Sequence, residues 1–189
     1  MRSHIDDVHQ DDGEQIFSRD SPEYGVRTPG NNLVWIIANH FKSKRGGDDP
    51  KSKRKRTRQA EAVARIYHRL KKEGHKFIAV AGDLNDTPSS TALAPLLDAT
   101  DLRDVSEHPT FDTGTFAGKG TYGLGNDSNK IDYLLLSPEL FSQVKASGLF
   151  RKGAWPGKQP QRWEVYPEIK SELHAASDHH VIWADIDIE

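Results

Sequence analysis

Short apolar runs alternate with polar clusters along this chain, and their spacing predicts its main elements. Residues 33–38 form a continuous apolar run rich in β-branched and aromatic side chains, which is typical of a strand buried on both faces. Residues 77–81 repeat this pattern. Between them, apolar positions at 57–73 recur with a helical period, and Gly74 is well placed to end that helix. We therefore predict a strand–helix–strand unit.

Weaker patterns extend the prediction toward both ends of the chain. They predict further strands at 15–19, 131–136 and 181–188, short helices at 88–97 and from Pro138, and a long glycine-rich loop at 106–130. Residues 20–32 contain Pro, Gly and Asn and are expected to be irregular.

Composition favours one soluble domain over residues 1–189. Hydrophobic residues make up 35% of the chain, charged residues 29%, and the mean hydropathy is −0.73. No apolar run approaches the roughly 18 residues that a membrane-spanning helix needs. A membrane-spanning protein is therefore excluded at this stage, and the sequence does not indicate a compartment.

The absence of cysteine limits the chemistry further. With 0 cysteines there is no thiol nucleophile and no thiolate metal site. Any metal must be held by Asp, Glu, Asn or His side chains, and an oxygen-rich set of these suits Mg²⁺ or Mn²⁺.

Positive charge is concentrated in one segment. The formal net charge is −2, yet residues 42–58 are dominated by Lys and Arg, and we interpret them as a basic loop. Such a loop either binds a polyanion or is simply solvated, and the sequence leaves both readings open.

Polar clusters follow or precede four of the predicted strands. They contain Asn39 and His40, Asp83 and Asn85, Asp132, and Asp178 with His179. Taken singly, each has a plain structural explanation, such as a turn residue, a core histidine, or an ion pair between Asp132 and Lys130. Together they combine carboxylates, a carboxamide and histidine at strand ends, which favours a metal-dependent site with a histidine for acid–base chemistry.

These clusters resemble the ordered motifs of the endonuclease/exonuclease/phosphatase superfamily. The matching segments are 39–43 (NHFKS), 82–86 (GDLND), 130–137 (KIDYLLLS) and 177–179 (SDH). The resemblance implies an α/β (α+β) fold, a four-layer α/β/β/α sandwich of two mostly antiparallel sheets. The chain resembles the C-terminal two thirds of a bacterial-type member that lacks its N-terminal strands.

The resemblance also implies a role for each matching residue. Asp83 and Asn85 would bind the reacting phosphate, position the attacking water and contact the metal, and Asp178 would be a metal ligand. His179 would be the acid–base or phosphate-stabilising residue, Asp132 would orient it, and His40 would donate to a phosphoryl oxygen. Arg19, Asn39 and Lys42 would contact substrate.

The expected function is metal-dependent phosphodiester hydrolysis, most simply by a nuclease acting on nucleic acid. Because the family's upstream metal-binding Glu has no clear counterpart, activity is expected to be impaired. The alternatives are a phosphatase, a phospholipid phosphodiesterase that uses Trp155 and Trp163 at a lipid interface, and a non-catalytic remnant that binds nucleic acid. An uncovered sheet edge is also expected to favour self-association.

Overall fold

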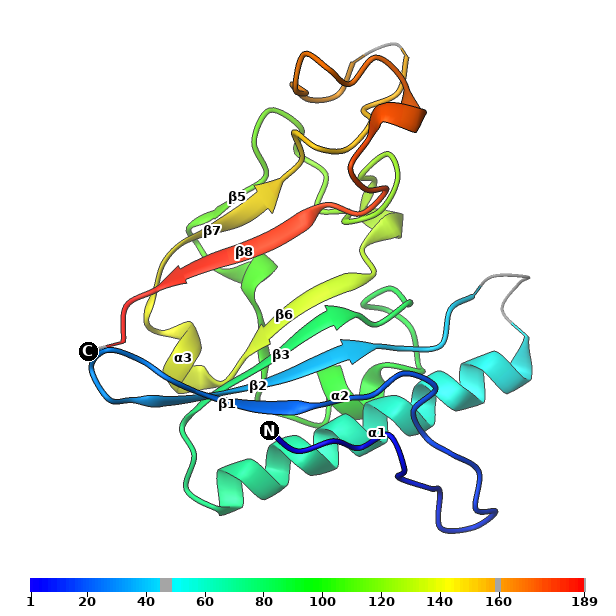
Figure 1. The fold of residues 1–189 in the computed structure, drawn as a ribbon, viewed down its shortest axis with the longest axis vertical. Coiled ribbons are helices and arrows are strands. Elements are labelled where there is room, and N and C mark those ends of the chain that lie inside the picture. Colours follow the sequence, from blue (N-terminus) through cyan, green and yellow to red (C-terminus); the bar gives the residue numbers. More distant parts are fainter. Residues whose placement is uncertain (45–48, 159–160, 189) are drawn as a thin grey trace.

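The computed structural model describes residues 1–44, 49–158 and 161–188, and it contains two sheets and one long helix (Figure 1). The strands are β1 (Glu23–Arg27), β2 (Leu33–His40), β3 (Phe77–Asp83), β4 (Arg103–Asp104), β5 (Phe111–Asp112), β6 (Asp132–Leu136), β7 (Val144–Phe150) and β8 (Val181–Ile186). The helices are α1 (Pro50–Lys72), α2 (Ala94–Leu97) and α3 (Pro138–Phe141), with 3-10 turns at Val105–Glu107, Asp127–Asn129 and Glu172–His174.

The larger sheet has five strands in the order β1-β2-β3-β6-β4. Strands β2 and β3 are parallel and are joined by α1, which confirms the predicted strand–helix–strand unit. The other neighbouring pairs in this sheet are antiparallel.

Helix α1 covers one face of the larger sheet and forms the main core with it (Figure 1). Tyr67 and Leu70 from the helix and Ile37, Ile78 and Val80 from the sheet are all 0% exposed. These are the apolar positions of the predicted helical period and of the two buried strands, so burial on this side follows directly from the pattern.

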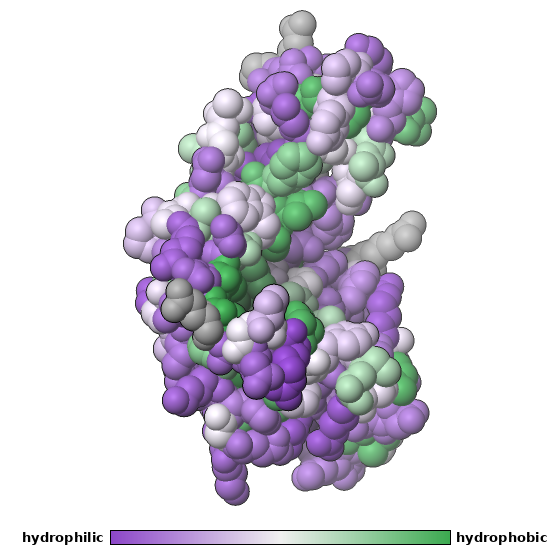
Figure 2. Space-filling view, turned by 60° about the vertical axis from the view of Figure 1, so that its left-hand side comes forward, coloured by the Kyte–Doolittle hydropathy of each residue, from purple (hydrophilic) through white to green (hydrophobic). Residues whose placement is uncertain are grey.

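The smaller sheet has three strands in the order β5-β7-β8 and packs on the other face of the larger sheet. Several side chains between the sheets are only half-buried, among them Val34, Ile182 and Ile186. Figure 2 shows apolar side chains gathering in a hollow on this side. In the described part of the chain, the layers are therefore helix, large sheet and small sheet. The expected α/β fold of two sheets is confirmed. Of the four expected layers, the described residues form three, and the outer face of the smaller sheet carries no helix among them.

Strand β8 lies at one edge of the smaller sheet. The outer face of this sheet exposes Phe150, Val181 and Trp183, at 44%, 58% and 39%. Self-association through this edge stays a prediction. No helix in the described ranges is both long and apolar enough to cross a bilayer.

Several predicted elements were wrong in place or extent. Residues 15–19 do not form a strand, because Gln15 makes only an isolated bridge to Val8, although Ile16 and Phe17 are buried in the core. The helix expected at 88–97 is confined to Ala94–Leu97, after a series of turns. Residues 20–32 were expected to be irregular, but Glu23–Arg27 within them form β1, which pairs with β2. The short strand β5 lies within the expected loop at 106–130, and β4 and β7 were not predicted.

The basic loop at 42–58 was also wrong in extent. Helix α1 begins at Pro50, because the side chain of Asp49 accepts hydrogen bonds from the backbone N–H groups of Lys51 and Ser52. Residues 50–58 are therefore helical, whereas residues 45–48 of the expected loop lie outside the described residues.

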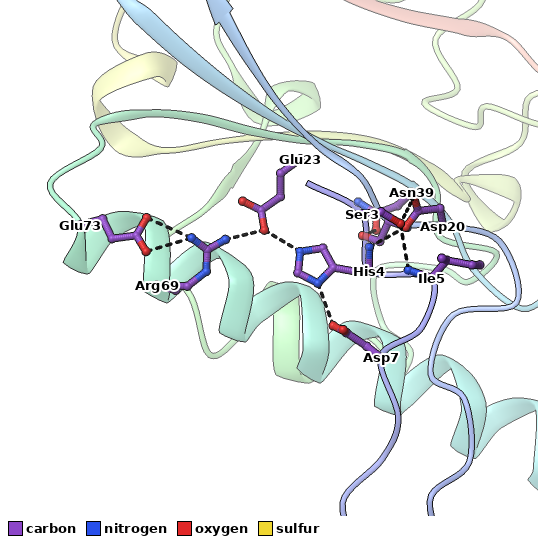
Figure 3. Close-up of polar contacts among 10 residues, drawn as sticks. Ser3, His4, Ile5, Asp7, Asp20, Glu23, Asn39, Arg69 and Glu73 are labelled. Atoms are coloured by element: carbon purple, nitrogen blue, oxygen red, sulfur yellow. Dashed lines mark hydrogen bonds and ion pairs between the residues drawn. The ribbon is translucent and has the colours of Figure 1, made fainter. Parts of the chain in front are cut away.

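The N-terminal segment is anchored by buried polar contacts (Figure 3). His4 is 4% exposed and lies between Asp7 and Glu23, with its ring nitrogens 2.7 and 2.5 Å from their carboxylate oxygens. Arg69 of α1 binds the same carboxylate of Glu23 and also that of Glu73. Burial raises the pKa of Glu23, but the hydrogen bonds from Arg69 and His4 outweigh it, so the net pKa is lowered.

Candidate active site

Three strands of the larger sheet place His40, Asp83 and Asp132 in one row. The register pairs His40 with Asp83 across β2 and β3, and Asp83 with Asp132 across β3 and β6. Directly paired residues project from the same face of a sheet. The ends of β2 and β3 and the starts of β6 and β8 all lie toward the right of Figure 1.

Gly82 allows the row to form. It has φ of +132°, and a Cβ at this position would lie 1.9 Å from the carbonyl oxygen of Asn39 on the neighbouring strand. Only glycine fits this approach without displacing one of the two strands. The glycine before Asp83 is thus required by the same pairing that brings His40 alongside.

Asp83 is held by the turn that follows it. Its Oδ1 accepts from the Asn85 backbone N–H at 2.7 Å, and its Oδ2 accepts from Asn85 Nδ2 at 2.8 Å. Asn85 has φ of 54°, a conformation that asparagine tolerates better than most residues, and Nδ2 also donates to the carbonyl oxygen of Phe41. His40 Nε2 lies 3.6 Å from Asp83 Oδ2. Burial, reinforced by the charge of Asp132, raises the pKa of Asp83.

His179 reaches the row from the start of β8. Its Nδ1 lies 2.9 and 3.1 Å from the two carboxylate oxygens of Asp132, to which it donates. Burial alone lowers the pKa of His179, but the hydrogen bond and charge of Asp132 outweigh it, so the net pKa is raised. The contact fixes the ring's tautomer and directs Nε2 away from Asp132. The alternative in which Asp132 forms an ion pair with Lys130 is excluded, because Lys130 instead pairs with Asp104 at 2.8 Å.

The donor set fits a divalent cation. Asp83, Asp132 and His179 each offer a ligand atom, and these atoms lie within 4.8 Å of one another. The two adjacent carboxylates repel each other, and the pKa of Asp83 is raised. A bound cation would offset this repulsion. Asp178 is exposed and is not part of this group, although its charge acts on His179.

The three residues expected to contact substrate are in different surroundings. Asn39 is 8% exposed, and its side chain donates to the Ile37 carbonyl and accepts from Ser21 Oγ, so its amide is engaged inside the protein. Arg19 is exposed. Lys42 is half-buried, and its backbone N–H donates to Gln59.

The basic segment divides into structural and exposed residues. Arg56 is 0% exposed and its Nε donates to Asp86 at 2.9 Å, so this residue supports the core. By contrast, Lys51, Lys53 and Arg54 are exposed on the first turns of α1. That end of α1 lies on the same side of the molecule as the ends of β2 and β3 (Figure 1). Arg45 lies outside the described residues.

Tryptophans of the late loop are not both available to a lipid interface. Trp163 is 5% exposed, and its Nε1 donates to the Ala154 carbonyl. Trp155 is half-buried and borders a pocket of about 550 Å³ together with Leu124 and Asp178. The suggestion that Trp163 contacts lipid was therefore wrong, because the side chain is used in packing.

Sequence reasoning missed the residues that support this site from behind. The hydroxyl of Thr121, which is 0% exposed, accepts hydrogen bonds from the backbone N–H groups of Ile131 and Asp132. Arg151 and His180 are also buried beside it. Their only sequence signal was proximity to the glycine-rich loop and to His179.

The chain belongs to the Endonuclease/Exonuclease/phosphatase family, which matches residues 4–153. None of the curated proteins matches the chain.

Solved structures support the same fold. A mannosyl-6-phosphatase from Bacteroides thetaiotaomicron has a TM-score of 0.59 and 15% identity, covering 84% of this chain and 52% of its own. Truncated TDP2 from Caenorhabditis elegans has a TM-score of 0.57 and 15% identity, covering 96% and 63%. The 3′ phosphatase NExo from Neisseria, bound to a product DNA hairpin, has a TM-score of 0.55 and 16% identity, covering 94% and 67%. The chain thus spans about half to two thirds of these structures.

Proposed function

We propose that this chain is a metal-dependent phosphodiester hydrolase of nuclease type. The observation that supports this most directly is the convergence of Asp83, Asp132 and His179, whose ligand atoms lie within 4.8 Å of one another at the ends of both sheets. Phosphoester hydrolysis needs a nucleophilic water, an aligned phosphate and stabilisation of developing charge. Two carboxylates and a histidine that converge in this way can activate the water, align the phosphate and stabilise the developing charge.

Asp83 and Asp132 would hold a Mg²⁺ or Mn²⁺ ion, and Asn85 and Asp178 are further candidate ligands. When bound, such an ion stabilises negative charge on phosphate oxygens and lowers the pKa of water. Since the group contains only two carboxylates, we expect weak metal binding and slow hydrolysis.

Three side chains of the site are suited to different proton transfers and hydrogen bonds during hydrolysis. Asp83 lies beside the proposed ion, and Asn85 holds its carboxylate in place, so Asp83 is positioned to orient the attacking water and accept its proton. The raised pKa of His179 favours the protonated imidazole, whose Nε2–H can donate to the phosphate or the leaving oxygen. His40 is half-exposed beside Asp83 and is placed to donate to a phosphoryl oxygen.

A nucleic-acid substrate is favoured by the exposed basic residues of α1. Lys51, Lys53 and Arg54 lie at the end of α1 nearest the candidate site, where they can neutralise phosphates flanking the scissile one. Consistent with this, the Neisseria structure of similar fold is bound to a product DNA hairpin.

The test is cleavage of supercoiled plasmid with Mg²⁺, with Mn²⁺ and with a chelator. We expect nicking with either metal and none with the chelator. His179→Ala should lower the rate of nicking about 10²- to 10⁴-fold. The matched control is His68→Ala, an exposed histidine on α1 away from the row. Equal rates for His179→Ala and wild type would contradict the proposal.

Salt dependence distinguishes the alternatives. Cleavage or binding of nucleic acid should weaken steeply with rising salt, whereas hydrolysis of a small phosphomonoester should not. Binding of plasmid without cleavage under any metal would indicate the non-catalytic alternative. Salt-insensitive hydrolysis of a sugar phosphate, without plasmid cleavage, would indicate a phosphatase.

A further inference from the structure

Arg151 is a buried cation behind the candidate site. It follows β7 directly and is 5% exposed. Its guanidinium donates to His180 Nδ1 at 3.1 Å, to the Thr113 carbonyl at 2.5 Å, to the Gly120 carbonyl at 3.3 Å and to the Gly118 carbonyl. All four of these acceptors are neutral.

Such a cation is costly to bury unless its donors are well satisfied. Phe116 and Trp163 flank the guanidinium, with ring centroids 5.7 and 5.6 Å from its central carbon. Burial lowers the pKa of Arg151 to about 10. Displacing any acceptor would leave a buried N–H group unpaired, so the acceptors are held in fixed positions relative to one another.

The contact also fixes the ring of His180. Because Nδ1 accepts from Arg151, the ring hydrogen is on Nε2, which donates to the Gly123 carbonyl at 3.1 Å. Burial, reinforced by the charge of Arg151, lowers the pKa of His180 to about 4, which keeps this ring neutral. The backbone N–H of His180 donates to the Thr121 carbonyl at 2.7 Å.

The segment held by Arg151 touches both members of the Asp132–His179 pair. Directly after Gly120, the Thr121 hydroxyl accepts from the backbone N–H of Asp132 at 2.9 Å. The next residue, Tyr122, forms an antiparallel bridge with His179, and the two ring centroids are 5.0 Å apart. One short stretch of backbone thus contacts both Asp132, the first residue of β6, and His179, which precedes β8.

We propose that Arg151 is the positioning residue for His179, acting through the His180 ring and the Gly118–Gly120 backbone to hold the imidazole against Asp132. The catalytic consequence rests on the proposed function. The structural consequence, hydrogen held on Nδ1 of His179 and on Nε2 of His180, does not.

The experiment compares wild type with Arg151→Ala and with His180→Ala, which removes only one of the four contacts. Two-bond ¹H–¹⁵N correlation spectra of ¹⁵N-histidine-labelled protein report which ring nitrogen carries hydrogen. Wild type should show His180 with hydrogen on Nε2 and His179 with hydrogen on Nδ1. In both variants, the Nδ1–H signal of His179 should weaken or shift.

Kinetics and chemical rescue give a second readout. In Arg151→Ala, kcat for plasmid nicking should fall about 10- to 100-fold, with KM changed by less than about twofold. Millimolar guanidinium chloride should restore part of the rate, and equal NaCl should not. The control for lost stability is Leu96→Ala in the core under α1, which is 0% exposed and should leave the histidine signals intact.

The outcomes separate this inference from the proposed function. If wild type shows the expected tautomers but cleaves nothing, the proposed function fails while the positioning role is still decided by the spectra. If Arg151→Ala does not fold, His180→Ala decides. Unchanged His179 signals in a folded variant, or different tautomers in wild type, would overturn the inference.

Discussion

The two sheets contribute to the same site but are held by different interactions. The larger sheet carries His40, Asp83 and Asp132 as a row whose positions follow from backbone pairing, over a core in which α1 residues are fully buried. The smaller sheet brings His179, which is located by polar contacts of loops rather than by a covered core. The position of Asp83 should therefore tolerate changes in the loop around Thr121, whereas the position of His179 should not.

Asp132→Asn tests the contact where the two sheets meet. The amide keeps the size of the side chain but removes the charge that favours protonated His179, so kcat for phosphodiester cleavage should fall about 10²- to 10⁴-fold. Plasmid nicking measures this. Asp98→Asn, an exposed residue at the end of α2, should keep the wild-type rate. An Asp132→Asn variant that is equally active would show that the contact plays no catalytic part.

Gly82→Ala tests whether strand pairing holds the row. The added Cβ would lie 1.9 Å from the Asn39 carbonyl oxygen, so β2 and β3 must separate locally. We expect a loss of about 3 kcal/mol in the free energy of unfolding, measured by urea denaturation. Gly114→Ala, where φ is +70° but nothing lies within 4 Å, is the control for backbone strain alone. Equal losses in the two variants would argue against the close approach.

Paired core truncations compare the two sides of the larger sheet. Leu70→Ala removes a side chain that is 0% exposed under α1 and should cost about 3 kcal/mol. Ile182→Ala, in the half-buried layer between the sheets, should cost about 1 kcal/mol because less surface leaves water. Urea unfolding of both variants measures the difference, and a larger loss at Ile182 would reverse the comparison.

The buried Glu23 gives the α1 side a specific pH dependence. Its pKa in the folded state is below its ordinary value of 4.5, so its contribution to stability is complete above that pH. The contribution is lost as pH falls through the folded-state pKa. Thermal unfolding between about pH 6 and 3 should show a shallower acid loss in Glu23→Gln than in wild type. Glu73→Gln, which removes the more exposed carboxylate bound by Arg69, should keep most of the acid loss.

The smallest expected effect concerns the free edge of the smaller sheet. With β8 at the edge and Trp183 exposed beside it, we expect weak, concentration-dependent self-association. Sedimentation velocity over a range of concentrations measures it. Trp183→Lys should reduce the association, and Leu173→Lys, at an exposed leucine in the turn Glu172–His174, should not. A wild-type protein that stays monomeric throughout would remove this prediction.

The local sequence determined the elements whose buried side chains follow the period of a helix or form the apolar run of a buried strand. The sequence showed β2 and β3 as apolar runs, because both faces of these strands are covered. It showed α1 by its helical period, because only one stripe of the helix is buried. The polar residues that follow the two strands were visible as well. The order of these motifs also sufficed to indicate the family.

Tertiary structure decided the features that depend on distant partners. Strand β7 contains Lys145, Ser147 and Gly148, and only pairing with β5 and β8 makes this mixed segment a strand. Likewise, the sequence could not show that Arg56 is buried against Asp86. The resemblance implied that Asp132 orients His179, but only the fold shows the contact and the backbone that supports it. Residue type and local pattern specify what a segment can do, but the partner of a charged side chain is chosen by long-range packing. For that reason the sequence by itself determined which residues could form this site, and only the fold decided how His179 is held in it.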